Sequence, residues 1–245
     1  LMVATFLVVY EKKLSNVKIR KWIPFAKCTQ CADCRKTATL CKDPSTKDEN
    51  QVTWREHLES TLKEREVYWA NKRESREDPT RTLCLTIDGA DQGDFHLPSW
   101  WEQDKRACKM YKLKTHVTGC LVAGRQPWCF VSGDACKNGH NLTIQVLYDV
   151  LVGIKKDEGV LPDHINIQLD NTTRQNKGKY FFAFCQYLVH KGVCKTITVN
   201  FLPVGHTHED IDQFFSRIAM RLRVDDALSL SWLARVIKAS YTTRE

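Results

Sequence analysis

Residues 82–88 have the sequence TLCLTID, a run of aliphatic and β-branched residues that ends on the acid Asp88. The pattern predicts a buried β-strand. A second run of this kind, INIQLD, occupies residues 165–170 and ends on Asp170. The elements that separate these two strands decide how they can pair.

The segments around the two strands follow a definite order. A hairpin of two strands follows the first acid-terminated strand, and three helices, the first with apolar residues at helical spacing, alternate with the later strands. The predicted order is β-β-β-α-β-α-β-α. The strands are expected at residues 82–88, 113–123, 128–132, 165–170 and 196–202, and the helices at residues 141–156, 179–190 and 208–222.

Few small folds share this order of elements. Three antiparallel strands followed by two right-handed αβ crossovers make a five-stranded mixed sheet, the ribonuclease H-like arrangement of nucleases, integrases and transposases. In that sheet the first and fourth strands are parallel neighbours. We therefore predict an α/β fold of this class in which Asp88 and Asp170 lie together at one edge, although they are far apart in the chain.

The first 80 residues differ from the rest of the chain. A helix is predicted to begin at Thr53, where Glu56 completes a capping box, and to end before Asp78-Pro79. We divide the chain into an N-terminal segment, residues 1–80, with a cysteine cluster and this helix, and a catalytic core, residues 81–245. The apolar face of the helix is thin, which predicts that it projects or packs against a partner; it consists of Trp54, Leu58, Leu62 and Trp69.

Two carboxylates at one sheet edge indicate a divalent-metal site. Cleavage of nucleic acids by two Mg²⁺ or Mn²⁺ ions about 4 Å apart uses hard oxygen ligands, and a third acid is expected on the last helix. A helical projection places Glu209 opposite the apolar stripe, Asp212 on one flank and Asp210 on the other. We prefer Asp212 and keep Asp210 as second choice. The predicted site is Asp88, Asp170 and Asp212, with His206 and His208 close by.

Two other interpretations of these residues are possible. A single aspartate at a strand end is usually a turn or cap residue, so the prediction rests on both strand ends together. The segment from His206 to Asp210 is similar to the HxHxDH zinc motif of metallo-β-lactamase-like hydrolases. Ile211 replaces the last histidine, however, and residues 213–245 contain no histidine, which argues against a binuclear zinc hydrolase.

Five segments form a pattern that extends from about residue 25 to residue 223. They are LDNTTRQNK at 169–177, FLPVGHTHEDIDQ at 201–213, TIDGADQ at 86–92, THVTG at 115–119 and FAKCTQC at 25–31. This pattern resembles an uncharacterised, transposase-like domain family found in transposon-derived reading frames of plants, protists and other eukaryotes. The resemblance implies a ribonuclease H core with a catalytic site of the DDE or DDD type, favours Asp212 over Asp210, and places His206 ahead of His208.

The cysteines suggest a second metal site. Eleven cysteines are present, an odd number, and most are scattered singly, which favours reduced thiols over a disulfide scaffold. We therefore expect a nuclear or nucleocytoplasmic protein that is not secreted. Four cysteines crowd together with a spacing that could surround one Zn²⁺, the alternative being buried free thiols. These are Cys28, Cys31, Cys34 and Cys41.

The charge pattern favours a polyanionic partner. The chain has 37 Lys and Arg against 29 Asp and Glu, a net charge of +8. A cluster of basic residues without an acid precedes the second strand, and an aromatic residue beside it could stack on bases, although a solvated charged hairpin is the alternative. No apolar run approaches the length of a membrane span. The predicted nucleic-acid contacts are Lys105, Arg106, Lys109, Lys112, Lys114 and Trp101.

Together these features predict metal-dependent cleavage and strand transfer of DNA by a transposase-like or integrase-like enzyme. The protein could also act as a homo-oligomer. One alternative keeps the fold and loses the chemistry: a host-adopted or inactive module that binds nucleic acid or protein. A second alternative is a ribonuclease of the same fold.

Overall fold

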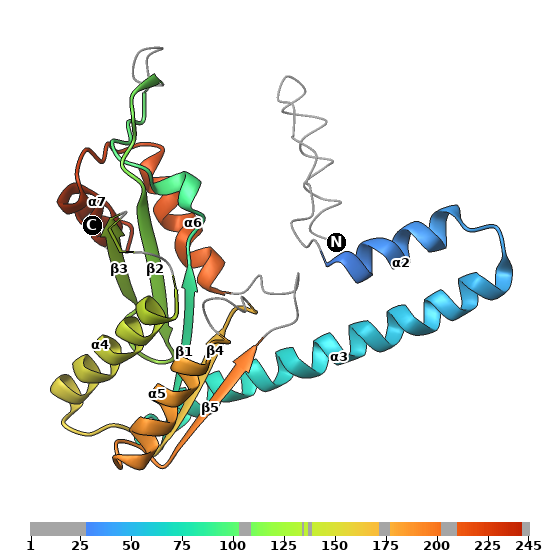
Figure 1. Ribbon diagram of the computed structural model, residues 1–245, viewed down its shortest axis with the longest axis horizontal. Coiled ribbons are helices and arrows are strands. Elements are labelled where there is room, and N and C mark those ends of the chain that lie inside the picture. The colour runs from blue at the N-terminus through green and yellow to red at the C-terminus, as the bar shows by residue number, and fades with distance from the viewer. Residues whose placement is uncertain are drawn as a thin grey trace, which may run out of the picture.

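The computed structural model describes residues 28–102, 109–133, 135–136, 139–171, 177–201 and 210–241. Its centre is a five-stranded sheet with the strand order β3-β2-β1-β4-β5 (Figure 1). β1 is antiparallel to β2 and parallel to β4, as the ribonuclease H-like arrangement requires. The predicted α/β fold class is thus confirmed. The strands are β1 Thr82–Gly89, β2 Thr115–Val122, β3 Trp128–Gly133, β4 His164–Leu169 and β5 Thr196–Phe201.

Helices cover both faces of this sheet. On one face, α4 and α5 pack on an aliphatic core that includes Leu85 and Ile167. On the other face, α6 and α7 pack on a second core around Phe214 and Leu233. The bounds are α2 Thr29–Leu40, α3 Pro44–Glu77, α4 His140–Glu158, α5 Lys179–His190, α6 Asp210–Leu222 and α7 Leu230–Ala239, with a short 3₁₀ helix at Gln92–Phe95.

The order of elements in the core matches the predicted order, with two additions. The 3₁₀ helix follows β1, and α7 follows α6. Sequence reasoning did not predict α7, although the Ser229 side chain accepts a hydrogen bond from Trp232 N at 3.2 Å as its N-cap. Several of the scattered cysteines, such as Cys120, Cys185 and Cys194, are buried in the α4/α5 core, where they act as small apolar residues.

The prediction for the start of the long helix was wrong. α3 begins at Pro44, and the Asp43 carboxylate caps it by accepting a hydrogen bond from Thr46 N at 3.0 Å. Asp-Pro is a stronger start signal than Thr53 with Glu56, because proline fits the first helical position and aspartate accepts the exposed N–H groups. The Thr53 hydroxyl instead donates to Glu49 O within the helix. The predicted end is confirmed, since Asp78 is the C-cap.

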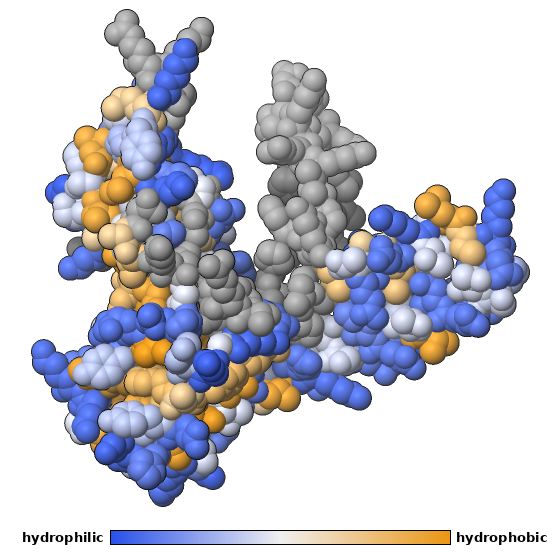
Figure 2. Space-filling view, viewed as in Figure 1, coloured by the Kyte–Doolittle hydropathy of each residue, from blue (hydrophilic) through white to orange (hydrophobic). Residues whose placement is uncertain are grey.

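The N-terminal half of α3 projects from the sheet, and α2 folds back beside it (Figure 1). We call α2 and this half of α3 the arm. Most of the arm is hydrophilic on the face drawn in Figure 2, with isolated hydrophobic positions. Leu62 and Val52 are 57% and 52% exposed, as the thin apolar face predicts. A division of the chain near residue 80 stays a prediction.

The C-terminal half of α3 is anchored on β1. The Ser75 hydroxyl accepts a hydrogen bond from Cys84 N at 3.0 Å, and Thr82 donates its hydroxyl proton to the Glu74 carboxylate at 2.9 Å. Within the described ranges, no helix is both long enough and apolar enough to span a bilayer.

Candidate active site

Two strands place Asp88 and Asp170 side by side. In the parallel pair β1/β4, Ile87 lies opposite Leu169. The residue after each of these is an aspartate, so Asp88 and Asp170 lie at the same edge of the sheet. Side chains alternate between the two faces of a strand. Because Leu85 and Ile87 point into the α4/α5 core, Asp88 points to the opposite face, the one that α6 covers.

The first turn of α6 carries Asp212. The helix is held on the sheet by the predicted apolar stripe, whose members are all buried: Ile211, Phe214, Phe215, Ile218 and Leu222. Burial of one stripe fixes the rotation of a helix about its axis. Asp212 lies beside this stripe and is only partly buried.

A glycine lets α6 approach the sheet next to the acids. Gly119 of β2 is paired with Asp88, and a Cβ at Gly119 would lie 3.0 Å from Phe215 Cζ and 3.2 Å from Phe214 Cε1. A side chain here would therefore push the helix away. Sequence reasoning did not single out Gly119, although an isolated glycine in a strand is a signal of close backbone approach.

The three acids lie close enough for the charges of Asp170 and Asp212 to affect Asp88. Burial and the neighbouring charge of Asp170 raise the pKa of Asp88 to about 7, with Asp212 adding a smaller increase and the Gly89 N–H opposing it. This N–H donates to Asp88 Oδ1 at 2.8 Å. A partly buried carboxyl that faces two further carboxylates holds unfavourable negative charge, which a divalent cation would relieve.

The three aspartates do not form one tight group of ligand atoms. Among the described residues, the group whose ligand atoms all lie within 4.8 Å of one another contains none of the three aspartates. Two ions about 4 Å apart need ligands spread over a wider region than one ion does. The donor set of carboxylate oxygens suits Mg²⁺ or Mn²⁺.

Asp210 takes a different role from Asp212. It forms an ion pair with Lys72 of α3 and accepts a hydrogen bond from the Tyr68 hydroxyl at 2.6 Å. Lys72 is only 2% exposed and also donates to the Tyr68 hydroxyl at 3.1 Å, and Tyr68 in turn contacts the hydroxyl of Thr86. We call these four side chains the Tyr68 network. It fastens α3 to α6 and β1, which favours Asp212 as the third acid.

Sequence reasoning missed Tyr68 and Lys72. A lysine and a tyrosine four residues apart on a charged helix give no pattern that distinguishes them from surface residues. Their burial comes from contacts with residues more than a hundred positions away, as in the Tyr68 hydrogen bond to Asp210.

The predicted DNA contacts lie only partly within the described residues. Lys105, Arg106, His206 and His208 fall outside them. Lys109, Lys114 and Trp101 are exposed, and Lys112 is partly buried. Leu97 and Leu113 pair in a bridge just beyond the end of β1 that carries Asp88, so the chain around Lys112 and Lys114 lies at that end of the sheet.

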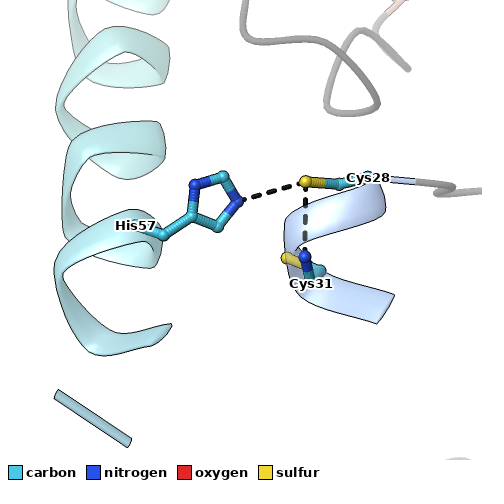
Figure 3. A group of neighbouring side chains, drawn as sticks. All are labelled: Cys28, Cys31 and His57. Atoms are coloured by element: carbon cyan, nitrogen blue, oxygen red, sulfur yellow. Dashed lines mark hydrogen bonds between the residues drawn. The ribbon is translucent and has the colours of Figure 1, made fainter. Parts of the chain in front are cut away.

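The predicted zinc quartet is brought together only in part. Cys28 and Cys31 lie close to each other, and His57 of α3 points toward them (Figure 3). Cys34 and Cys41 are not in this group. The third member of the group is thus His57, a residue that sequence reasoning did not consider, and the zinc site stays a prediction.

The strand order and the pairing of β1 with β2 and β4 define a ribonuclease H-like α/β core. Residues 105–245 match the family model described as "Domain of unknown function (DUF7869)". The chain belongs to this family. No curated protein matches it in sequence.

Among solved structures, the chain is similar to two complexes of Mos1 transposase. One is the paired-end complex with the left transposon end, with a TM-score of 0.45, 10% identity, and coverage of 99% of this chain and 81% of that chain. The other is the Mos1 mariner paired-end complex with Mn, with a TM-score of 0.44, 11% identity, and coverage of 97% and 66%.

Proposed function

We propose that this protein is a transposase-like or integrase-like enzyme that cleaves DNA and transfers its strands with the help of two Mg²⁺ or Mn²⁺ ions. The ligands in this proposal are Asp88, Asp170 and Asp212. The supporting observation is the parallel pairing of β1 and β4, which puts Asp88 and Asp170 next to each other at one sheet edge. Burial and the charges of Asp170 and Asp212 also raise the pKa of Asp88 to about 7. Resting carboxylates repel one another in this arrangement, and bound cations would stabilise it.

The metal ions, the three acids and the two histidines have different roles in this proposal. When bound, the two ions would activate a water or hydroxyl nucleophile and stabilise the charge that develops on the phosphate and the leaving oxygen. β1 and β4 hold Asp88 and Asp170 on rigid strands, and α6 presents Asp212 from the opposite side. In this proposal His206 orients the water or the scissile phosphate, and His208 supports Asp212.

Basic residues at the same end of the sheet would hold the DNA. Lys109 and Lys114 are exposed and carry positive charge to the end of β1 where Asp88 lies. Trp101 is 57% exposed and could stack on an unpaired base. Lys105, Arg106 and Lys112 complete the proposed contacts. A homo-oligomer and a nuclear or nucleocytoplasmic location belong to the same proposal.

The test uses the full chain with labelled DNA carrying candidate transposon ends and with matched RNA, each in Mg²⁺, Mn²⁺ or EDTA. We expect metal-dependent cleavage of DNA. Asp88→Asn, Asp170→Asn and Asp212→Asn should each lower the rate about 10³-fold or more, because each removes a ligand charge worth several kcal/mol in the transition state. The control Asp157→Asn removes an exposed acid on α4, on the far side of the sheet, and should have no effect.

Other outcomes would overturn the proposal in defined ways. DNA binding that is independent of metal, without cleavage, would indicate an inactive or host-adopted binding module. Metal-dependent cleavage of RNA alone would indicate a ribonuclease. Full activity of Asp212→Asn together with loss of activity in Asp210→Asn would move the third acid to Asp210.

A further inference from the structure

The arm contains a cluster of metal-binding side chains that is separate from the three aspartates. Cys28 is the N-cap of α2, Cys31 lies in its first turn, and His57 reaches across from α3 (Figure 3). The three ligand atoms lie within 4.8 Å of one another, with Cys28 Sγ 3.3 Å from His57 Nε2. Both cysteines are only 5% exposed.

These distances are close to those around a tetrahedral zinc ion. Bonds of about 2.3 Å to sulfur and about 2.0 Å to nitrogen place sulfur and nitrogen ligands roughly 3.5 Å apart. The observed separation of 3.3 Å between Cys28 Sγ and His57 Nε2 needs little adjustment to accept the ion. Two thiolates and one imidazole are also the soft and borderline donors that zinc prefers.

The N-terminus of α2 lies beside the sulfur of Cys28. Cys28 lies at the N-terminus of α2, where the helix dipole stabilises negative charge, and its sulfur accepts a hydrogen bond from Cys31 N at 3.5 Å. The buried indole N–H of Trp54 has no hydrogen-bond partner of normal geometry among the described residues. Burial and the neighbouring Cys28 raise the pKa of Cys31 above its ordinary value, and the Trp54 indole opposes this increase. A bound cation would deprotonate both thiols and give this N–H a thiolate acceptor.

The packing of the arm gives a reason for a metal. α2 has 12 residues, and its buried side chains are Cys31 and Cys34. A helix of this length is marginal in water unless tertiary packing stabilises it. Leu40, at its end, is 75% exposed. The two helices of the arm therefore share little apolar surface, and small units of this kind commonly rely on a structural metal.

We propose that Cys28, Cys31 and His57 bind one Zn²⁺ that fastens α2 to α3, with solvent in the fourth position. Cys34 and Cys41 are not ligands. The Cys41 thiol donates to Asp43 O at the turn between the helices, and the turn of α2 that carries Cys34 is held by Asn50 Nδ2, which donates to Cys34 O at 2.8 Å. This site is independent of the proposed DNA chemistry.

The first measurement is the zinc content of the purified full chain, by mass spectrometry of the metal. We expect about one zinc per chain. X-ray absorption at the zinc edge should show two sulfur ligands and the remainder nitrogen or oxygen. A chain that takes up no zinc, even after titration with it, would overturn the proposal, and so would a shell of four sulfurs.

The second measurement compares variants. His57→Ala, Cys28→Ser and Cys31→Ser should each lose zinc or bind it at least 10-fold more weakly, whereas Cys34→Ala and Cys41→Ser should retain it. Circular dichroism checks that each variant is folded. Retention of zinc by His57→Ala, or its loss from the folded Cys34→Ala chain, would contradict the ligand assignment. Cleavage of DNA is not part of either measurement, so failure here and failure of the proposed function can be distinguished.

Discussion

The two faces of the central sheet are built on different principles. On the α4/α5 face, β1 contributes the aliphatic side chains Leu83, Leu85 and Ile87, all buried in one continuous core. On the α3/α6 face, the same strand contributes Thr86, which joins the Tyr68 network, and then Asp88. Alternate residues of a single strand thus serve two purposes.

The difference shows where the molecule can tolerate unfavourable charge. The aliphatic face supplies stabilisation by burial of apolar surface. The opposite face contains a buried lysine, a half-buried aspartate and the three acids, groups that are costly unless they are paired. Lys72 and Asp210 form an ion pair, whereas burial and the charges of Asp170 and Asp212 raise the pKa of Asp88 to about 7. We expect the first face to determine stability and the second to determine activity.

The largest contrast should come from one substitution on each face. Asp88→Asn should lower DNA cleavage about 10³-fold or more while leaving the free energy of unfolding unchanged or higher, since it removes a repelled charge. Leu147→Ala should lower the free energy of unfolding by about 3 kcal/mol, because Leu147 is completely buried, and should leave the activity of the folded fraction intact. Chemical denaturation and single-turnover cleavage measure the two effects. Equal loss of activity in both variants would contradict the expectation that the two faces differ in their role.

The Tyr68 network lies on the same face as the apolar core around Phe214 and Leu233, and breaking it should be costly. Lys72→Met leaves the Asp210 carboxylate without its cation, so the free energy of unfolding should fall by about 3 kcal/mol. Urea denaturation measures this change. Lys155→Met, which alters an exposed lysine on α4, is the matched control and should be nearly neutral. Stability that is restored in the double variant Lys72→Met, Asp210→Asn would support the pairing, and an unchanged Lys72→Met chain would contradict it.

The acids should make stability depend on pH in an unusual direction. The pKa of Asp88 is raised from its ordinary value of 3.8 to about 7, so between these values the native state binds more protons than the unfolded state. The free energy of unfolding should therefore fall as the pH rises from about 4 to 7, by on the order of 2 kcal/mol after allowance for solvent screening.

Thermal unfolding at several pH values measures this dependence, which should be weaker in Asp88→Asn. Mg²⁺ should raise the midpoint at pH 8 in the unsubstituted chain and much less in Asp88→Asn. The same Mg²⁺ response in both proteins would argue against a metal at Asp88.

A pair of glycines gives the smallest and most local contrast. Gly119→Ala places a methyl group against Phe215 on the α6 side, and should lower cleavage about 10-fold with a stability loss of about 1 kcal/mol, because α6 and Asp212 must shift slightly. Gly153→Ala places its methyl group against the Trp128 ring on the α4 side. It should cost about 1–3 kcal/mol of stability without lowering the activity of the folded fraction. The reverse pattern would show that α6 does not position the site.

Local patterns were enough to predict the sheet and the location of the acids. The order of the strands, two of which lead to Asp88 and Asp170, predicts the topology of the sheet. The apolar stripe around Phe214 predicts which face of α6 packs on the sheet. Apolar residues mark the strands and the buried face of α6 at the spacing typical of each element, so both can be detected in the sequence alone. Membership of the metal site stays a prediction.

Contacts between distant segments could not be predicted in this way. Lys72 and Tyr68 look like surface residues until α6 covers them, and His57 is one histidine on a charged helix until α2 folds back. The start of α3 is a different case, because the sequence itself carries two cap signals, and Asp43-Pro44 is stronger than Thr53 with Glu56. Only tertiary structure decides the contacts of Lys72, Tyr68 and His57, whereas local sequence decides the start of α3.

The continuity of α3 has a mechanical consequence. The helix has 34 residues in one uninterrupted rod, about 50 Å long at 1.5 Å per residue. His57 lies near the middle of this helix, and Tyr68 and Lys72, closer to its C-terminal end, hold α6 two residues from Asp212. A rigid rod transmits a tilt along its whole length. A partner that binds the outer end of the arm and tilts α3 would therefore change the angle of this helix where Lys72 contacts Asp210, close to Asp212.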